Sequence, residues 1–220
     1  MRSVIIAAVA AGLLLCAIAL STCSASVPAY RDGYRSSVHL IFSSGASCTG
    51  TVVGKRTVLT ATHCHQDNDD KDNAVLTHVD FRKVSHIRIV RDGNDHSLIF
   101  LGHELTSKRI ATIAPRMADV GTEVYVWGNP GTLTYQLRVG RVAGILGANV
   151  ATGFKMPFNT ATIDMNNFIG DSGSGIFDYN GRVVGVLYGQ YQRRGLSGDA
   201  FSLTIAMPIK FTRQQMESIR

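Results

Sequence analysis

The chain has 220 residues, of which 45% are hydrophobic and 17% charged, so it is long enough for one large domain or two small ones and too apolar to be disordered. The formal net charge is +6, but the basic residues are scattered and form only short pairs such as Lys108-Arg109 and Arg193-Arg194. A nucleic-acid-binding surface typically shows a clustered basic stripe or interleaved aromatic residues. We therefore expect a solvated basic surface and no nucleic-acid partner.

The segment at residues 1–26 differs in composition from the rest of the chain. A basic residue at position 2 precedes residues 4–20, which carry no charge, and the small residues STCSAS follow. A short positive end, an apolar core and a small-residue region predict a secretory signal peptide, cleaved after Ala25 or Ser26. Residues 27–220 are then expected to work outside the cytoplasm.

Two alternatives to a cleaved leader stay open. The 17 apolar residues at 4–20 reach the lower edge of a membrane span, so the first alternative is an uncleaved anchor, which would be the chain's only contact with a membrane. The second is lipid attachment at Cys23, although Thr22 directly before it makes a poor lipoprotein signal. Both alternatives also place residues 27–220 outside the cytoplasm, in the periplasm or anchored to a membrane.

The body of the chain has the pattern of short strands separated by turns. Segments rich in Val, Ile, Thr and Phe are punctuated by Gly, Asn, Asp or Ser at spacings typical of sandwiches and barrels. The expected strands of a first series are 37–44, 51–54, 57–62, 74–81, 84–90 and 96–102, and those of a second series are 122–128, 134–146, 158–165, 174–189 and 199–209. In the second series, the Asn180-Gly181 pair predicts a tight hairpin.

The two series define an all-β protein with two halves of similar size, at about 36–103 and about 121–208. The residues between them, about 104–120, show no convincing helical period and are expected to form a connector. In the tail, Phe211, Met216 and Ile219 can share one face of a helix. A short C-terminal helix is therefore expected at about 209–219.

Two of the four cysteines, Cys48 and Cys64, lie outside the leader. In an exported protein such a pair predicts a disulfide bond, which stabilises the fold by about 3 kcal/mol if it acts by constraining the unfolded chain. The alternative is a metal site formed by His63, Cys64 and His65, but adjacent ligands lack the usual zinc spacings. We expect no metal and no cofactor.

The stretch FIGDSGSGIF at 168–177 has two interpretations. Clusters of Gly, Ser and Asp between apolar runs are usually turns, and the alternative is a turn that presents Ser172 as a nucleophile. Two other stretches bear on the choice: SCTGTVVGKRTVLTATHC at 47–64, in which His63 precedes a cysteine, and DGNDHSLIFL, in which Asp95 precedes an apolar run. The order along the chain is therefore histidine, aspartate and serine, and the resemblance described next favours the catalytic interpretation.

These stretches resemble the chymotrypsin-like serine protease family. TATHC at 60–64 matches the family's T-A-x-H-C, DHSLI at 95–99 matches D-x-x-L-[IL], GDSGS at 170–174 matches G-D-S-G-[GS], and Cys48 matches the family's partner cysteine. Residues 120–131 also resemble a stretch of bacterial members, including HtrA-type domains, although we expect no PDZ module here. The resemblance implies two six-stranded antiparallel β-barrels with the site in the cleft between them.

The resemblance also implies a role for each residue of the constellation. Ser172 would be the nucleophile, His63 the general base and acid, and Asp95 the residue that orients the imidazole and stabilises its charged form. The backbone N–H groups of Gly170 and Ser172 would form the oxyanion hole. By the same analogy, Asp171 would anchor their loop from behind.

The substrate pocket is likewise implied by the resemblance. Asn166, six residues before the nucleophile, would lie at the bottom of the P1 pocket, and Leu187, Tyr188 and Gly189 would form the wall that pairs with the substrate backbone. Because Asn lacks the carboxylate that selects Arg or Lys, we expect an uncharged P1 residue. The alternative is that Asp199 reaches the pocket and restores a preference for basic side chains.

The sequence therefore predicts an exported serine endopeptidase, acting as a monomer on proteins or peptides. No Ile-Val-Gly-Gly follows a basic activation site, so activation by a newly formed N-terminus is not expected. A secreted binding protein that keeps the fold without hydrolysis, or an esterase, are the alternatives. The acidic loop at 65–73 is expected to be solvated, with calcium ligation as the alternative.

Overall fold

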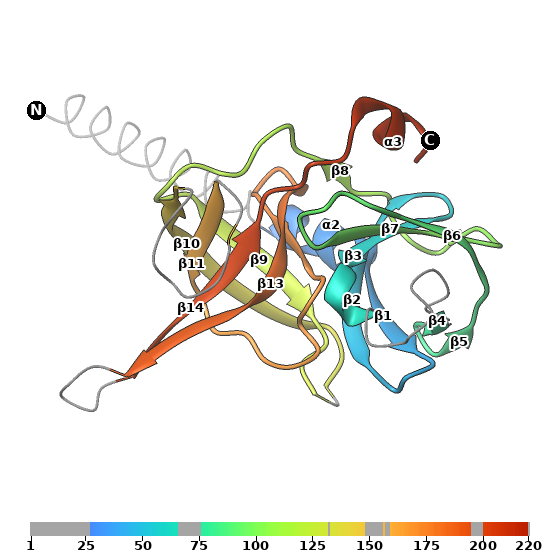
Figure 1. The fold of residues 1–220 in the computed structure, drawn as a ribbon, viewed down its shortest axis with the longest axis horizontal. Coiled ribbons are helices and arrows are strands. Elements are labelled where there is room, and N and C mark those ends of the chain that lie inside the picture. Colours follow the sequence, from blue (N-terminus) through green and yellow to red (C-terminus); the bar gives the residue numbers. More distant parts are fainter. Residues whose placement is uncertain are drawn as a thin grey trace, which may run out of the picture.

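The computed structural model describes residues 27–65, 76–131, 133–147, 156, 159–194 and 200–219. Most of these residues form strands, and the strands divide into two sheets that contact each other (Figure 1). Each sheet is built from strands that follow one another in the chain, so the two predicted strand series correspond to the two sheets.

The first sheet is antiparallel throughout and has the order β5-β4-β1-β2-β3-β7-β6. Its strands are β1 (Ser37–Phe42), β2 (Ser47–Gly54), β3 (Thr57–Ala61), β4 (Leu76–Val79), β5 (Arg82–Lys83), β6 (His86–Arg91) and β7 (His96–Leu101). Alternating apolar residues of β1, namely Val38, Leu40 and Phe42, pack with Val58 and Ile99 in the core of this half. Residues two apart in a strand point to the same face, and this periodicity explains the shared core.

The second sheet has the order β12-β9-β10-β11-β14-β13-β8, and β12 also pairs with β13. Its strands are β8 (Thr112–Ile113), β9 (Glu123–Gly128), β10 (Gln136–Leu146), β11 (Thr160–Asp164), β12 (Gly175–Phe177), β13 (Arg182–Arg194) and β14 (Ala200–Met207). The β12–β13 pairing closes six antiparallel strands into a barrel, and the two-residue β8 adds to β13 in parallel. As predicted, β12 and β13 form a hairpin around Gly181, whose φ is +70°.

The predicted fold class, an all-β protein of the chymotrypsin type, is confirmed. The two halves differ in closure: the second is a closed six-stranded barrel, whereas the first is a curled half-barrel that no hydrogen-bonded pairing closes among the described residues. The domain boundaries given above remain predictions.

The prediction of a single helix, in the tail, was incomplete. The tail helix, α3 (Arg213–Glu217), is shorter than expected and begins at a capping box in which Thr212 and Gln215 bind each other's backbone N–H. A second helix, α2 (Val27–Ser36), precedes β1 and contacts β9 and β2. No helix of the described ranges is long and apolar enough to cross a membrane.

Another hydrophobic cluster joins the two halves. Leu59, Leu98 and Phe100 come from the first sheet, and Tyr125 and Phe177 come from the second, where their rings stack at 5.2 Å between centroids. Phe211, Met216 and Ile219, predicted to share a helical face, also pack in this cluster. The tail therefore helps to fix the two sheets relative to each other.

Candidate active site

His63 and Asp95 meet because the strands that carry them are neighbours. Strand β3 runs antiparallel to β7, with Ala61 opposite His96. His63 lies two residues beyond Ala61, in the short 3-10 helix Thr62–Cys64, and Asp95 directly precedes β7. The backbone N–H of Thr62 donates to the Asp95 carbonyl at 2.7 Å and locks the two strand ends together.

The Asp95 carboxylate holds His63 at two points. Its Oδ1 accepts the backbone N–H of His63 at 2.9 Å, and its Oδ2 lies 2.6 Å from His63 Nδ1. Because a carboxylate only accepts, Nδ1 carries the proton and Nε2 is left as an acceptor in the neutral ring. The Asp95 side chain is 16% exposed and that of His63 is 35% exposed, so the ring can be reached from solvent.

Asp95 adopts a left-handed conformation with φ of +67°, which is uncommon for a non-glycine residue. The turn that imposes it is closed by the buried Asp92 carboxylate, which accepts the backbone N–H groups of Asn94 and His96 and lies 2.6 Å from His96 Nδ1. Burial acts to raise the pKa of Asp92, but the link to the His96 ring and the backbone N–H groups of Lys210 and Asn94 lower it below its usual value. The conformation of Asp95 is therefore maintained by its neighbours in the turn.

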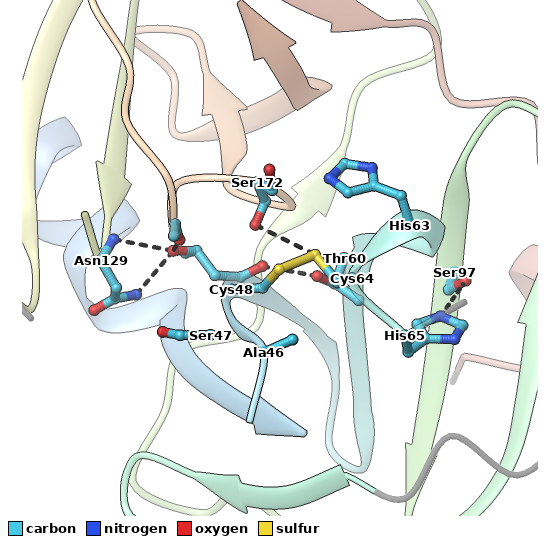
Figure 2. The surroundings of a disulfide bond; sticks show 12 residues. Ala46, Ser47, Cys48, Thr60, His63, Cys64, His65, Ser97, Asn129 and Ser172 are labelled. Atoms are coloured by element: carbon cyan, nitrogen blue, oxygen red, sulfur yellow. Dashed lines mark hydrogen bonds between the residues drawn. A yellow bond between two sulfur atoms is a disulfide. The ribbon is translucent and has the colours of Figure 1, made fainter. Parts of the chain in front are cut away.

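Ser172 lies in the turn between β11 and β12 and contacts both halves of the molecule. Its carbonyl accepts the backbone N–H of Thr49 at 2.9 Å, and its Oγ lies 3.5 Å from the Tyr188 carbonyl. The Tyr188 ring contacts the His63 ring edge-on, with 5.3 Å between centroids. Figure 2 shows Ser172 and His63 on the same side of the disulfide. Within the described residues, Ser172 Oγ makes no hydrogen bond to His63.

The N–H groups of Gly170 and Ser172 are left without a hydrogen-bond partner in the described part of the chain. The preceding carbonyls are bound: Ile169 O accepts from Gly131 N at 2.7 Å, and Asp171 O accepts from Ser174 N at 3.0 Å. In a trans peptide the C=O and N–H point in opposite directions, so each bound carbonyl directs the following N–H away from its own partner.

Glycine is required at two positions of this turn. Gly170 has φ of +100°, and a Cβ there would lie 2.3 Å from the Asn129 carbonyl. Gly173 has φ of +83°, and its Cβ would lie 2.3 Å from the Thr49 carbonyl. Both positions therefore exclude other side chains, by backbone conformation and by space.

The Asp171 carboxylate is fully buried behind Ser172 and is paired with Arg138 of β10. Its Oδ2 also accepts the backbone N–H of Phe168 at 2.7 Å. Burial raises the pKa of Asp171, while the Arg138 guanidinium and the Phe168 N–H lower it. The family resemblance implied that Asp171 anchors the loop, but no motif pointed to Arg138, which lies 33 positions earlier in the chain.

Leu187 and Tyr188 of the predicted pocket contact the turn that carries Ser172, and the structure adds one residue to the set. Leu187 is buried and forms backbone hydrogen bonds with Gly173 and Ser174. Tyr188 and Gly189 follow on β13 and are half-buried, and a Cβ at Gly189 would meet no atom within 4 Å. Space is therefore available beside Gly189. Asp199 lies outside the described residues.

The addition is Asn167, which the sequence analysis missed. Asn166 is exposed, whereas Asn167 is buried and its Nδ2 donates to Gly189 O at 3.0 Å and to Thr204 Oγ1 at 2.7 Å. Thr204 Oγ1 in turn donates to Met165 O, which fixes the orientation of the Asn167 amide. Asn167 thus bridges β13 and β14 beside the predicted pocket.

Cys48 and Cys64 form the predicted disulfide, with 6.3 Å between their Cα atoms (Figure 2). The alternative metal site is wrong, because the Cys64 sulfur is used in the disulfide, His63 binds Asp95, and His65 Nε2 lies 2.9 Å from Ser97 Oγ. Residues 66–73 of the predicted acidic loop lie outside the described residues.

Two facing β-sheets, with a His–Asp pair beside a Gly-Asp-Ser-Gly turn at their contact, define a protein of the two-barrel peptidase class. A model of the trypsin-like peptidase domain matches residues 48–186, more than half of the chain, and the chain therefore belongs to this family.

Solved structures of this class share the fold. The active form of the Rv3671c protease from M. tuberculosis is 21% identical, with a TM-score of 0.65 over 87% of this chain and 84% of that one. The inactive Ser343Ala form of Rv3671c from M. tuberculosis H37Rv is 20% identical, with a TM-score of 0.63 over 87% and 90% of the two chains. Deg5 is 16% identical, with a TM-score of 0.60 over 84% and 88%. No curated protein matches the chain.

Proposed function

We propose that the chain is an exported serine endopeptidase in which Ser172, His63 and Asp95 carry out peptide hydrolysis through an acyl-enzyme. The single observation that carries the proposal is the double attachment of His63 to Asp95, at the backbone N–H and at Nδ1. This attachment leaves Nε2 as the one basic nitrogen of the ring, beside a turn that presents a serine. A binding protein would not require an oriented, solvent-accessible imidazole at this place.

In the proposed acylation, Ser172 Oγ rotates from the Tyr188 carbonyl toward His63 Nε2, which accepts its proton as Oγ attacks the scissile carbonyl. The imidazolium that forms is stabilised by Asp95 and then protonates the leaving amine as the C–N bond breaks. In deacylation, water loses its proton to His63, attacks the ester carbon and releases the acid, and Ser172 recovers its proton. Hydrogen bonds of this kind are often long before substrate binds.

The tetrahedral intermediate carries a negative oxygen, and the N–H groups of Gly170 and Ser172 are its proposed donors. Their lack of partners among the described residues and the bound carbonyls before them support this role. A donor of this kind typically contributes about 3–4 kcal/mol of transition-state stabilisation. No cofactor takes part in this chemistry.

The proposed substrate is a protein or peptide with an uncharged P1 residue. The side chain that binds the Gly189 carbonyl is the neutral amide of Asn167, which also binds Thr204 of β14 and supplies no carboxylate there. Asp199 is the one residue proposed to alter this preference. Comparing P1 Ala, Leu, Arg and Lys substrates in wild type and Asp199→Asn tests this part of the proposal, and a preference for Arg that disappears in the variant would contradict it.

Export is supported by the Cys48–Cys64 disulfide, because such bonds persist in oxidising compartments, and by the composition of residues 1–26. A monomer is the proposed state. Mass spectrometry of the protein recovered from an exporting host tests where the leader is cut.

The proposal is tested by active-site labelling. A fluorophosphonate probe should label Ser172 in the folded, oxidised protein, and labelling should disappear in Ser172→Ala and His63→Ala. Ser174→Ala, two residues along the same turn, is the matched control and should still be labelled. Cleavage of peptides as well as esters then separates an endopeptidase from an esterase, and a folded protein that neither labels nor cleaves would be a binding protein.

A further inference from the structure

The Thr49 side chain makes three hydrogen bonds in the buried contact between the two halves. Its Oγ1 donates to Gly170 O at 2.8 Å and accepts the backbone N–H and the Nδ2 of Asn129, at 3.0 and 2.9 Å. Thr49 and Asn129 are both fully buried. A hydroxyl has one donor and two acceptor sites, so every hydrogen-bonding site of Thr49 Oγ1 is used.

Thr49 also binds the nucleophile's own residue, because its backbone N–H donates to Ser172 O at 2.9 Å. One residue of β2 therefore holds the carbonyls of both Gly170 and Ser172. These are the two residues whose N–H groups are the proposed oxyanion donors. Each carbonyl shares a rigid peptide plane with the next N–H group, that of Asp171 or Gly173. Thr49 therefore fixes the peptide between the two that carry the proposed donors and the peptide that follows them, and a shift of either plane reaches the donor N–H groups through the φ and ψ angles of residues 170–172.

Asn129 extends this control to the preceding peptide. Its Oδ1 accepts the backbone N–H of Tyr135 at 3.1 Å and closes the loop from 129 to 135. Within that loop, Gly131 N donates to Ile169 O at 2.7 Å, and this bond sets the direction of the Gly170 N–H. Thr49 and Asn129 together therefore bind or support the carbonyls of 169, 170 and 172.

We propose that Thr49 and Asn129 are positioning residues for the oxyanion hole, acting as a buried hydroxyl–amide clamp on the Gly170 and Ser172 backbone. The inference rests on the proposed function, since it assigns these side chains to acyl transfer. Neither side chain reaches the reacting atoms. Their effect is on the tetrahedral intermediate, because the substrate carbonyl gains its negative charge only there.

The test begins with Thr49→Val, which replaces the hydroxyl by a methyl group of similar shape. We expect kcat for a peptide substrate to fall about 10- to 100-fold, while KM changes less than about threefold. The inhibition constant of a peptidyl trifluoromethyl ketone, whose hemiketal oxygen occupies the oxyanion hole, should rise by the same factor as kcat/KM falls. Thr49→Ser, which keeps the hydroxyl, should restore both values to within about threefold of wild type.

Asn129→Asp is the second variant, for the case in which Thr49→Val does not fold. It keeps the acceptor for Tyr135 N but replaces the Nδ2 donor by an acceptor. The Thr49 hydroxyl is then drawn to the new carboxylate and releases Gly170 O. We expect the same fall in kcat and the same rise in the inhibition constant of the trifluoromethyl ketone, with KM nearly unchanged.

The matched control is Thr51→Val. Thr51 lies two residues along β2, is fully buried, and its Oγ1 accepts the backbone N–H of Gly175 at 3.0 Å, beyond the proposed oxyanion residues. It should lose stability as Thr49→Val does but keep kcat and ketone inhibition within about threefold of wild type. If both Thr49→Val and Asn129→Asp behave like Thr51→Val, the clamp is wrong.

Failure of the proposed function gives a different result, namely a wild-type protein that neither labels at Ser172 nor cleaves peptides. In that case amide hydrogen exchange decides the clamp on its own. Exchange of the 169–172 segment should accelerate in Thr49→Val and not in Thr51→Val. Unchanged exchange in both variants would overturn the clamp whatever the activity of the wild type.

Discussion

Asp171 and Arg138 form an ion pair directly behind Ser172, with the carboxylate fully buried and the guanidinium 15% exposed. In the family that this sequence resembles, classical activation places a newly formed N-terminal ammonium beside this aspartate. Here a side chain of β10 supplies the positive charge, within the fold itself. The turn from Gly170 to Ser174 therefore has its countercharge without any cut in the chain.

The first prediction concerns Arg138→Met, which leaves the Asp171 carboxylate buried without a partner. We expect a loss of about 3–5 kcal/mol in the free energy of unfolding at neutral pH, together with a loss of activity. A carboxyl group whose pKa is raised by folding contributes stability in acid and loses it as the pH rises through that pKa. Removing Arg138 raises the pKa further, so the loss measured by urea unfolding should be smaller at pH 5 than at pH 8.

The controls for this prediction lie in the same ion pair and on the same strand. Arg138→Met combined with Asp171→Asn removes the charge as well and should recover part of the lost stability. Arg141→Met breaks an exposed pair with Glu123, at 3.6 Å, and should cost no more than about 1 kcal/mol. Equal losses for Arg138→Met and Arg141→Met would contradict the prediction.

The fold could be predicted from the sequence because its signals are local. Strands β9 and β10 were expected at 122–128 and 134–146 and are found at Glu123–Gly128 and Gln136–Leu146. Helix α2 was missed because Gly33 in its interior lowers its intrinsic propensity. The helix is held by tertiary contacts instead: the Tyr30 ring lies 4.8 Å from that of Tyr125, and Trp127 Nε1 donates to Tyr30 O.

The supporting residues of the site could not be predicted from the sequence. Arg138 and Asn167 lie in no motif, and Thr49 and Asn129 lie at positions of the 47–64 and 120–131 stretches to which no role was assigned. All four reach their partners only through the packing of the two sheets. Thr49 and Gly170, for example, are 121 positions apart. The roles of His63, Asp95 and Ser172 rest on motifs in contiguous stretches and stay predictions until the labelling experiment is done.

The second prediction concerns His65, which is buried against Ser97 and Phe42. Burial, and then the charge of Arg91, lower its pKa to about 4 from a usual value of 6.5. Only the unfolded chain takes up the proton between these values, so stability is fully present above pH 6.5 and falls as the pH drops toward 4. The loss from this residue should be about 3 kcal/mol by pH 4.

Urea unfolding at pH 7 and pH 4.5 checks this prediction in wild type and His65→Gln. Glutamine keeps a polar group near Ser97 but does not titrate, so the variant should lose less stability between the two pH values. His86→Gln, at the start of β6 in the same sheet, is the control and should follow the wild type. If His65→Gln loses as much unfolding free energy between pH 7 and pH 4.5 as the wild type, another group is responsible for the pH dependence of stability.

The third prediction concerns the disulfide, whose two cysteines are each next to a residue of the site in the chain. Cys48 precedes Thr49, Cys64 follows His63, and the Cys64 sulfur lies 3.8 Å from Ser172 O. The cysteines are 16 positions apart, so removing the disulfide should lower the free energy of unfolding by about 3 kcal/mol. Unfolding of Cys48→Ala/Cys64→Ala measures this loss. Activity should fall as well, even at temperatures where the variant is folded, and full activity in the folded variant would contradict this part.

The fourth prediction concerns Gly189 and tests the pocket by filling it. A Cβ at Gly189 meets no atom within 4 Å, so Gly189→Val should fold with nearly the stability of wild type. Yet its side chain would enter the space beside Asn167 and Tyr188 that the P1 residue is proposed to occupy. For two peptides that differ only in P1, kcat/KM should fall about 10- to 200-fold for phenylalanine and much less for alanine.

Gly147→Val, where an added Cβ also meets no atom within 4 Å, is the control and should leave both substrates unaffected. An equal loss for both peptides in Gly189→Val would mean that the P1 side chain lies elsewhere, because filling a pocket penalises the larger side chain first.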